Sequence, residues 1–197
     1  MEICLAKNIT EVEEIKSLQT RNLKKNISLK NRLIDGFLTA SYSINFLIKM
    51  NELTPAIIAK QSNRVIGYVL ATDRSLLSEH PLLRDLSSQI NKISFRNKTI
   101  EDFNYLVVGQ LCVAKEFRGL GIAQQLYIHF KKTYKNRYAF AITDVDQKNN
   151  ASLAMHLKVG FKALSTLSYG KSKWDVVVWD WENTCLLYTS PSPRDKS

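Results

Sequence analysis

The chain has 197 residues, of which 45% are hydrophobic and 10% aromatic. This length and composition fit one globular domain and exclude a disordered chain. The net charge of +10 predicts an attraction to anions, a class that includes phosphorylated cofactors, acidic metabolites and nucleic acid. The densest basic stretch, residues 21–32, has no interleaved aromatic side chains, which argues against a stacking surface for single-stranded nucleic acid.

The sequence predicts a soluble, cytoplasmic protein. Its first residues lack the basic segment and long apolar stretch of a signal peptide, and no uncharged apolar run approaches the ~20 residues that span a bilayer. The scattered Cys4, Cys112 and Cys185 argue against a disulfide framework and against a zinc site, so no metal is expected. Residues 183–197 resemble translated vector sequence, which leaves a single expected domain over residues 1–182.

The predicted elements follow an order typical of a mixed α/β domain without internal repeats. Two apolar runs joined by the polar turn 61–64 indicate an antiparallel hairpin. In chain order we expect a strand at 2–7, a helix capped by Thr10 with Glu13 at capping-box spacing, a helix at 40–50, strands at 55–60 and 65–71, an irregular, partly helical insertion at 74–103, a strand at 105–113, a helix at 120–136, a strand at 138–144, a helix at 150–158, and strands near 162–169 and 173–181.

The most informative segment is the loop VAKEFRGLGIA at residues 113–123, which leads from a predicted strand into a predicted helix. Gly119 and Gly121 permit positive φ angles and a close approach of backbone to a ligand. The first amides of a helix are unpaired and carry partial positive charge, and Arg118 adds a cation at the rim. Together these features favour a pyrophosphate site.

Other interpretations of this loop are weaker. A Walker loop requires GxxxxGK[ST], which the sequence lacks. A dinucleotide fingerprint requires GxGxxG, but Gln124 stands at the third glycine position, although Asp144 ends the next predicted strand where a ribose-binding acid would lie. A glycine turn before a core helix remains the purely structural alternative.

Two motifs resemble the GNAT superfamily of N-acetyltransferases. RGLGIA at residues 118–123 matches that family's [QR]-x-x-G-x-[GA] acetyl-CoA loop, and NNASLAMHLKVGF at residues 149–161 is similar to its N-x-x-[AS]-x-x-x-Y-x-K-x-G-F segment, with His156 where tyrosine is commonest. The resemblance is specific over 105–162 and loose over 1–75. It implies a mostly antiparallel central sheet flanked by helices. It also implies transfer of an acetyl group from acetyl-CoA to a primary amine, by direct attack in a ternary complex.

The resemblance also implies roles for particular groups. Backbone groups of the strand end at 111–113 would hold the pantetheine arm and polarise the acetyl carbonyl, and the loop amides would hold the pyrophosphate. Cys112 is expected to pack in the core rather than act as a nucleophile. The expected cofactor-binding residues are Leu111, Cys112, Val113, Arg118, Gly119, Leu120, Gly121, Ile122, Ala123, Asn149 and Ser152.

One face of the helix at 150–158 is predicted to be catalytic. Asn149, Ser152 and His156 share this face, and the apolar Leu153 and Leu157 lie opposite. The resemblance implies that the polar stripe faces the cofactor thiol, where His156, with an unperturbed pKa of about 6.5, could protonate the departing thiolate. Alternatively Asn149 is only the helix N-cap and His156 only a hydrogen-bonding surface residue.

The general base and the acceptor are less constrained. Asp144 and Asp146 are the best-placed acids, with Glu101 and Asp102 as alternatives. The acceptor is expected to be a small-molecule amine or a peptide or protein amine, and the basic net charge favours an anionic or neutral acceptor over a polyamine. A homodimer is compatible with this interpretation. The competing hypotheses are a non-catalytic acyl-CoA-binding module and a basic protein that binds nucleic acid or the ribosome.

Overall fold

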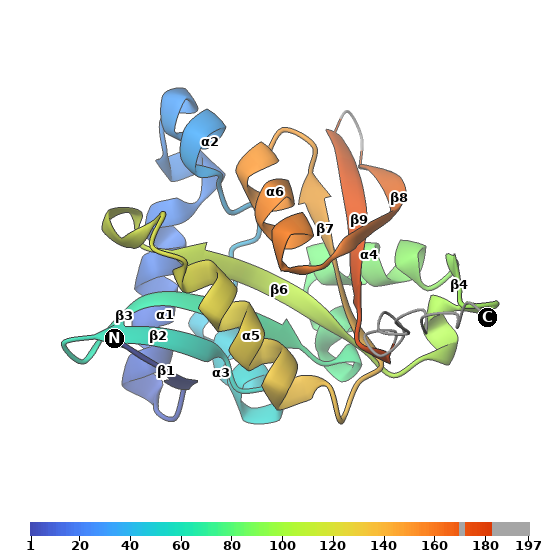
Figure 1. The fold of residues 1–197 in the computed structure, drawn as a ribbon, viewed down its shortest axis with the longest axis horizontal. Helices are drawn as coiled ribbons and strands as arrows, with labels where there is room; N and C mark the ends of the chain where they lie inside the picture. Colours follow the sequence, from blue (N-terminus) through green and yellow to red (C-terminus); the bar gives the residue numbers. More distant parts are fainter. Residues whose placement is uncertain (170–171, 183–197) are drawn as a thin grey trace, which may run out of the picture.

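The computed structural model describes residues 1–169 and 172–182 (Figure 1), so the predicted tail at 183–197 lies outside the described residues. Within these ranges a mixed sheet runs in the order β1-β2-β3-β6-β7-β9-β8. Every neighbouring pair is antiparallel except β6 and β7, which are parallel. The predicted mixed α/β fold with a mostly antiparallel sheet is therefore confirmed. The strands of this sheet are β1 (Glu2–Leu5), β2 (Ile57–Gln61), β3 (Arg64–Thr72), β6 (Tyr105–Val113), β7 (Phe140–Asp146), β8 (Lys162–Tyr169) and β9 (Ser172–Asp180).

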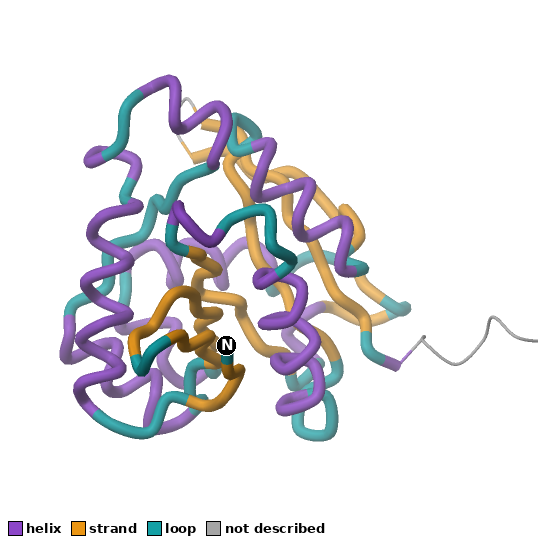
Figure 2. The backbone as a smooth tube through the Cα atoms, turned by 60° about the vertical axis from the view of Figure 1, so that its left-hand side comes forward, coloured by secondary structure: helices purple, strands orange, loops and turns teal. Residues whose placement is uncertain are grey.

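Helices cover both faces of the sheet (Figure 2). Because successive side chains of a strand point to opposite faces, buried β3 supplies Tyr68 to one core and Val69 to the other. The first core is shared with α1, α3 and α4, and the second with α5 and α6. No helix in the described ranges is both long and apolar enough to cross a membrane. The α-helices are α1 (Ile9–Asn22), α2 (Leu29–Asp35), α3 (Ile44–Leu53), α4 (Pro81–Ile90), α5 (Ile122–Tyr134) and α6 (Asn150–Val159).

The structure differs from the sequence prediction in three local features. Asn8, not Thr10, caps α1, because its side chain accepts a hydrogen bond from the amide of Glu11 at 3.0 Å. Helix α2 was not expected. The insertion at 74–103 is more regular than predicted and contains the 3₁₀ helix η2 (Arg74–Glu79), α4, a hairpin of β4 (Ser94–Phe95) and β5 (Lys98–Thr99), and η3 (Ile100–Asp102).

The parallel strands β6 and β7 stay paired over only part of their length. Their register runs from Tyr105 beside Phe140 to Val107 beside Ile142. Beyond these residues the two strands no longer pair with each other, although β6 stays paired with β3 and β7 with β9. Figure 1 shows them diverging beyond this point. A gap therefore opens in the middle of the sheet, at the carboxyl ends of its two parallel strands, which is where open α/β sheets commonly bind ligands.

A bulge in β6 lies at the start of this gap. The register with β3 pairs Leu70 with Gln110 and Ala71 with Val108, so Gly109 is the extra residue. A Cβ atom at Gly109 would lie 2.8 Å from Oγ1 of Thr72, so a side chain here would force its neighbours to move. The bulge changes the direction of β6 where the strand begins to line the gap.

Candidate functional site

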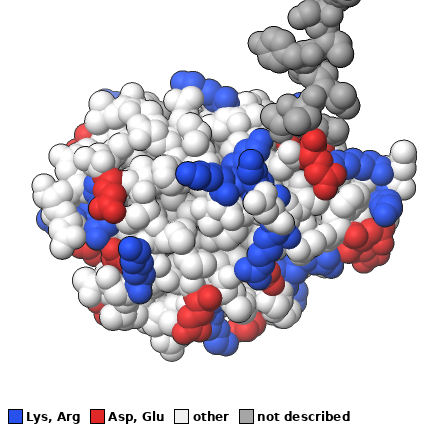
Figure 3. Space-filling model, turned by 60° about the horizontal axis from the view of Figure 1, so that its bottom comes forward, with Lys and Arg blue, Asp and Glu red and all other residues white. Residues whose placement is uncertain are grey.

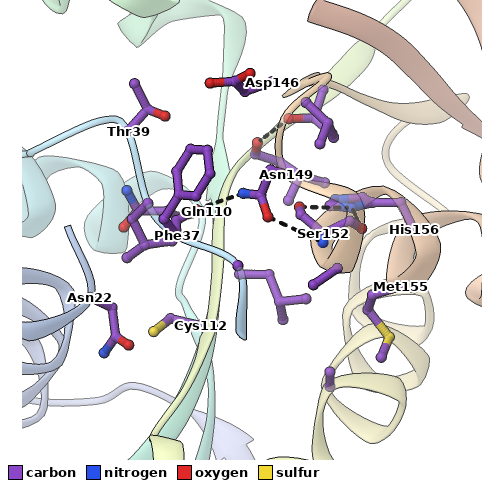
Figure 4. Close-up of a pocket in the computed structure, with 18 of the residues that line it drawn as sticks. Asn22, Phe37, Thr39, Gln110, Cys112, Asp146, Asn149, Ser152, Met155 and His156 are labelled. Carbon is purple, nitrogen blue, oxygen red and sulfur yellow. Dashed lines mark hydrogen bonds between the residues drawn. The ribbon is translucent and has the colours of Figure 1, made fainter. Parts of the chain in front are cut away.

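A cavity of about 620 Å³ occupies the gap between β6 and β7. This volume lies in the range of sites for small molecules and cofactors. Figure 4 shows Phe37 and Thr39 on one side, and Asn149, Ser152 and His156 of α6 on the other. The segment between α2 and α3, the loop before α5, helix α4 and the ends of β8 and β9 complete the wall.

The predicted phosphate loop forms one end of the cavity. Gly119 and Gly121 have φ angles of 77° and 75°, the left-handed conformation that glycine permits. Helix α5 begins at Ile122, later than the predicted Leu120, and Gly121 at its N-cap offers no side-chain acceptor. The first hydrogen bond of the helix runs from the amide of Gln125 to the carbonyl of Gly121. The amides at positions 122–124 therefore have no partner within the helix. Leu120 is 65% exposed and is not part of the cavity wall.

Arg118 is held by the protein itself. Its Nε donates to the carbonyl of Val113 at 3.0 Å, and a terminal N–H donates to Oδ1 of Asn22 at 2.5 Å. The other terminal nitrogen lies 3.5 Å from Oδ2 of Asp35. The guanidinium group therefore ties the phosphate loop to the end of α1 and to α2, in addition to lining the cavity.

The strand end at 111–113 presents alternate amides to the cavity. Ala114 donates to the carbonyl of Ile66 on β3 at 2.8 Å, so the amide of Cys112 also faces β3. The amides of Leu111 and Val113 therefore face the open side, toward β7. Burial raises the pKa of the Cys112 thiol to about 12, which keeps it protonated and fits a packing role.

The two acids predicted at the end of β7 are in different environments. Burial raises the pKa of Asp144 to about 6. The hydroxyl of Tyr169, which lies beside this carboxylate, lowers the pKa by a smaller amount. Asp146 forms an ion pair with Lys24 at 2.9 Å and accepts a hydrogen bond from the amide of Lys148 at 3.0 Å. Asp144 thus lines the cavity without an ion pair among the described residues, whereas Asp146 stabilises the turn before α6.

The alternative bases Glu101 and Asp102 are not brought to the cavity. Both belong to η3, where the carbonyl of Glu101 accepts from Arg74 at 3.0 Å and the carboxylate of Asp102 accepts from the amide of Thr99 at 2.9 Å. Neither residue is part of the cavity wall. The structure therefore separates these acids from the site.

His156 lies inside the aromatic core rather than on a solvated stripe. It is 4% exposed, and burial lowers its pKa to about 4. Its Nδ1 lies 2.7 Å from the carbonyl oxygen of Ser152, so the proton resides on Nδ1, and Nε2 accepts from the hydroxyl of Tyr127 at 2.8 Å. The opposite face, predicted to be buried, carries Leu157 at 46% exposure. The imidazole therefore has no proton to donate into the cavity.

Asn149 connects α6 to the opposite wall. Its Oδ1 accepts from the amide of Ser152 at 3.4 Å as the N-cap, and its Nδ2 donates to the carbonyl of Phe37 at 2.8 Å (Figure 4). A Cβ atom on Gly36 would lie 2.7 Å from Oδ1 of Asn149, so the two segments are in close contact. The side-chain amide is thus used within the protein, whereas Ser152 lines the cavity.

The lining residues that the sequence did not predict include Asp85 on α4, Tyr169 on β8 and Trp174 on β9. Trp174 pairs with Asp146 across β7 and β9, and its ring lies 6.0 Å from that of Tyr169. The pairing of β9 with β7 brings these residues to the site. The sequence places Tyr169 and Trp174 in its two final predicted strands. It does not indicate which strand of the sheet these two strands would pair with.

Known proteins resemble this chain in sequence and in fold. The profile of the acetyltransferase (GNAT) family matches residues 31–161, and a comparison with curated proteins gives no match. Among solved structures, smu.2055 from Streptococcus mutans UA159 aligns with a TM-score of 0.62 and 18% identity, over 91% of this chain and 99% of that one. The NatC complex bound to Gag peptide and CoA aligns with a TM-score of 0.56 and 20% identity, over 92% and 99%. YhbS from Escherichia coli in complex with CoA aligns with a TM-score of 0.56 and 16% identity, over 91% of this chain and 80% of that one.

These structural likenesses show the fold, and the family profile covers more than half of the sequence. The chain belongs to the acetyltransferase (GNAT) family.

Proposed function

We propose that this protein transfers an acetyl group from acetyl-CoA to a primary amine. The observation that carries the proposal is that one cavity joins the uncapped N-terminus of α5 to the half-buried carboxylate of Asp144. The first can hold a pyrophosphate, and the second can accept a proton from an amine. Membership of the family supports the reaction class, and the CoA bound in two of the structural neighbours supports the donor.

The residues of the cavity suit acetyl-CoA, which supplies the acetyl group as a reactive thioester. The backbone from Arg118 to Ala123 offers amides to the pyrophosphate, and a Cβ on Gly119 would meet no atom within 4 Å, so a ligand can approach this backbone closely. The amides of Leu111 and Val113 face the open side, where they can bind the arm and the acetyl carbonyl. Ser152 contributes a hydroxyl to the same wall.

Asp144 begins the reaction by accepting a proton from the acceptor ammonium group. The neutral nitrogen then attacks the thioester carbonyl carbon, so that a C–N bond forms and the C–S bond breaks. The electron pair of the C–S bond leaves with sulfur, which takes the second proton from nitrogen to give the thiol. The carbonyl oxygen gains negative charge in the transition state, and the backbone amides of β6 stabilise it.

His156 is not given the role of general acid in this proposal, because its single ring N–H, on Nδ1, donates to the backbone carbonyl of Ser152. A thiol with a pKa of about 8.5 is a good leaving group and needs little help from an acid. His156 instead holds α6 against α5 through Tyr127, which fixes the wall that carries Ser152.

A non-catalytic acyl-CoA-binding module is the second candidate. The observation that favours it is that His156 stands where the family most often has tyrosine, and that both of its ring nitrogens are engaged by Tyr127 and the carbonyl of Ser152. Such a module would bind acetyl-CoA but would not release CoA in the presence of an amine.

A nucleic-acid-binding role has less support. On the face shown in Figure 3, lysine and arginine side chains occur in separate groups among neutral and acidic residues rather than as a continuous stripe. The scattered cysteines fit a reducing compartment, so we place the proposed activity in the cytoplasm.

Calorimetric titration with acetyl-CoA, CoA and NADH tests the donor, and a thiol-release assay over a panel of amines tests the transfer. We expect binding of acetyl-CoA and CoA, no binding of NADH, and amine-dependent release of CoA. Binding without release for every amine would favour the non-catalytic module. Failure of a folded protein to bind either CoA species would contradict both candidates.

A further inference from the structure

The end of the cavity away from the phosphate loop has a distinct chemistry. We call it the acceptor end, and Figure 1 shows that α4 and β8, which contribute to it, lie across β7 from the loop before α5. The acceptor end consists of Leu82, Leu83, Asp85, Leu86, Asp144, Tyr169 and Trp174.

The acceptor end is acidic, although the whole chain is basic. Asp144 is half-buried, and no ion pair with a cation is found for it in the described part of the chain. The charge of Asp144 and that of Asp85 both raise the pKa of Tyr169, so this hydroxyl lies near two carboxylates. The cations that line the cavity, Arg118 and Lys158, belong to the phosphate loop and to the last turn of α6. A cationic group would therefore be attracted to the acceptor end.

One hydrogen-bond donor at the acceptor end has no partner. Among the described residues the buried indole Nε1 of Trp174 makes no hydrogen bond, whereas the hydroxyl of Tyr169 lies beside the carboxylate of Asp144. An indole N–H can only donate, and a buried donor without a partner costs free energy. A ligand that supplies a carbonyl oxygen beside its ammonium group would satisfy the indole and pair with the carboxylate at the same time.

The remaining wall of the acceptor end is apolar. Leu82, Leu83 and Leu86 come from consecutive turns of α4, and Leu82 is 46% exposed although it lines the cavity. A ligand that covers this side chain would remove apolar surface from water. The acceptor end thus combines attraction for a cation, a donor for a carbonyl and a surface for an aliphatic group.

We propose that the acceptor is an α-amine next to a carboxamide, carried by a residue with an aliphatic side chain. Asp144 contacts the ammonium group, Trp174 donates to the carbonyl oxygen, and the leucines of α4 contact the side chain. Asp85 adds a second negative charge at the entrance. This chemistry occurs in free amino-acid amides and at the N-termini of peptides. The inference rests on the proposed function, because it assigns the acceptor of the same reaction.

The acidity of the amine supports this class over lysine-type amines and polyamines. An α-amine has a pKa of about 7.7–8.0, whereas a lysine amine has a pKa near 10.4. Burial raises the pKa of Asp144 only to about 6, which is below the pKa of either amine. Because the α-amine is the more acidic of the two, its proton passes to this carboxylate more easily than that of a lysine amine, by a factor of roughly several hundred. A free amino acid would bring its own carboxylate close to Asp85.

Four probes separate these features. L-leucinamide carries all three groups, 3-methylbutylamine lacks only the carboxamide, and L-leucine replaces the amide with a carboxylate. A tetrapeptide amide that begins with leucine distinguishes a peptide acceptor from a free amino-acid amide. We expect kcat/KM, expressed per neutral amine, to be at least about tenfold higher for leucinamide than for 3-methylbutylamine or leucine, as one satisfied hydrogen bond implies.

Two substitutions connect the preference to named side chains. Trp174→Phe removes the indole N–H but keeps an aromatic ring, and it should reduce the ratio of leucinamide to 3-methylbutylamine to within about threefold. Asp85→Asn should lower kcat/KM for leucinamide and raise it for leucine. Glu13→Gln, an exposed acid on α1 outside the cavity wall, is the charge-matched control. Affinity for acetyl-CoA should stay unchanged in all three variants.

The outcomes separate this inference from the proposed function. Equal or faster turnover of 3-methylbutylamine, or a ratio that Trp174→Phe does not change, would overturn the α-amine assignment and leave the transferase intact. Calorimetric binding of leucinamide to CoA-saturated protein without any acetyl transfer would contradict the transferase, and with it the assignment of leucinamide as an acceptor. Preference for the tetrapeptide over leucinamide would support the assignment and identify peptides as the source.

Discussion

The imidazole Nε2 of His156 lies 2.8 Å from the hydroxyl of Tyr127, so the histidine links α6 to α5 within the aromatic core. Phe161 and Trp179 surround the same tyrosine, with ring centroids 5.4 Å and 5.7 Å from it. The residue that the sequence offers as a proton donor therefore contributes to stability. This relationship leads to two predictions that a catalytic role would not make.

His156→Ala should lower the free energy of unfolding by about 2–4 kcal/mol at pH 7.5, because it leaves a cavity and an unpaired tyrosine hydroxyl. Tyr127→Phe should cost about 1 kcal/mol. Urea denaturation measures both. A fully stable His156→Ala protein that had lost about a hundredfold in kcat would instead indicate a general acid.

The low pKa of His156 should make stability depend on pH. The folded pKa of about 4 lies below the unfolded value of about 6.5, so its contribution is present above pH 6.5 and is lost as the pH falls toward 4. The loss amounts to at most about 3 kcal/mol. In His156→Gln this part of the pH dependence should disappear, which denaturation curves at pH 7 and pH 5 can establish.

Asp144→Asn should stabilise the protein at neutral pH while it lowers activity. The folded pKa of about 6 lies above the unfolded value of about 3.9, so the contribution of Asp144 is favourable below pH 4 and is lost as the pH rises through 6. We expect a gain of about 1–3 kcal/mol at pH 7.5 and a decrease in kcat/KM of about 10²–10⁴-fold.

Asp146→Asn is the matched control for Asp144→Asn, since it breaks the ion pair with Lys24 and should destabilise the protein. Similar stability changes in the two variants would contradict the difference in environment described above.

The rate of transfer should also depend on pH. The acidic limb of kcat/KM should have an apparent pKa near 6, because Asp144 must be ionised to accept a proton. The same limb should persist in His156→Gln and be lost in the residual activity of Asp144→Asn. An acidic limb that moved in His156→Gln and not in Asp144→Asn would reverse these roles.

Gly121→Val should abolish detectable binding of acetyl-CoA. The φ angle of 75° is one that a β-branched residue rarely adopts, so the loop must change its conformation and its amides must move. Ile128→Ala, at an exposed position of the same helix, should bind normally. Calorimetry compares the two, and equal affinities would show that the loop is not the phosphate site.

The sequence predicts most of the sheet and the phosphate loop because these features are encoded locally. Apolar runs around a polar turn indicate the β2–β3 hairpin, and the turn residues Ser62 and Asn63 do adopt positive φ angles. Gly119 and Gly121 likewise have the backbone conformation that a close approach requires. Helix α2 escapes prediction because it has no buried residues, so no amphipathic pattern marks it.

The rest of the site depends on long-range packing that periodicity does not encode. The spacing of Asn149, Ser152 and His156 indicates a shared helix face, but it does not determine the depth at which each lies. The contact of Arg118 with Asn22 spans 96 residues, and the acceptor end combines α4, β7, β8 and β9. The overall positive charge of the chain favours an anionic or neutral acceptor. The proposal of a cationic acceptor rests instead on the carboxylates of Asp85 and Asp144 at the acceptor end.

The short seam between β6 and β7 has a consequence for backbone hydrogen exchange. Past Val107 and Ile142, β6 lacks a strand neighbour on one side, so the amides of Leu111 and Val113 have no strand partner there. These two amides should exchange with solvent faster than that of Cys112 in the same strand. A bound acyl donor would occupy the position of the missing strand and slow their exchange. In this sense such a ligand would complete the sheet.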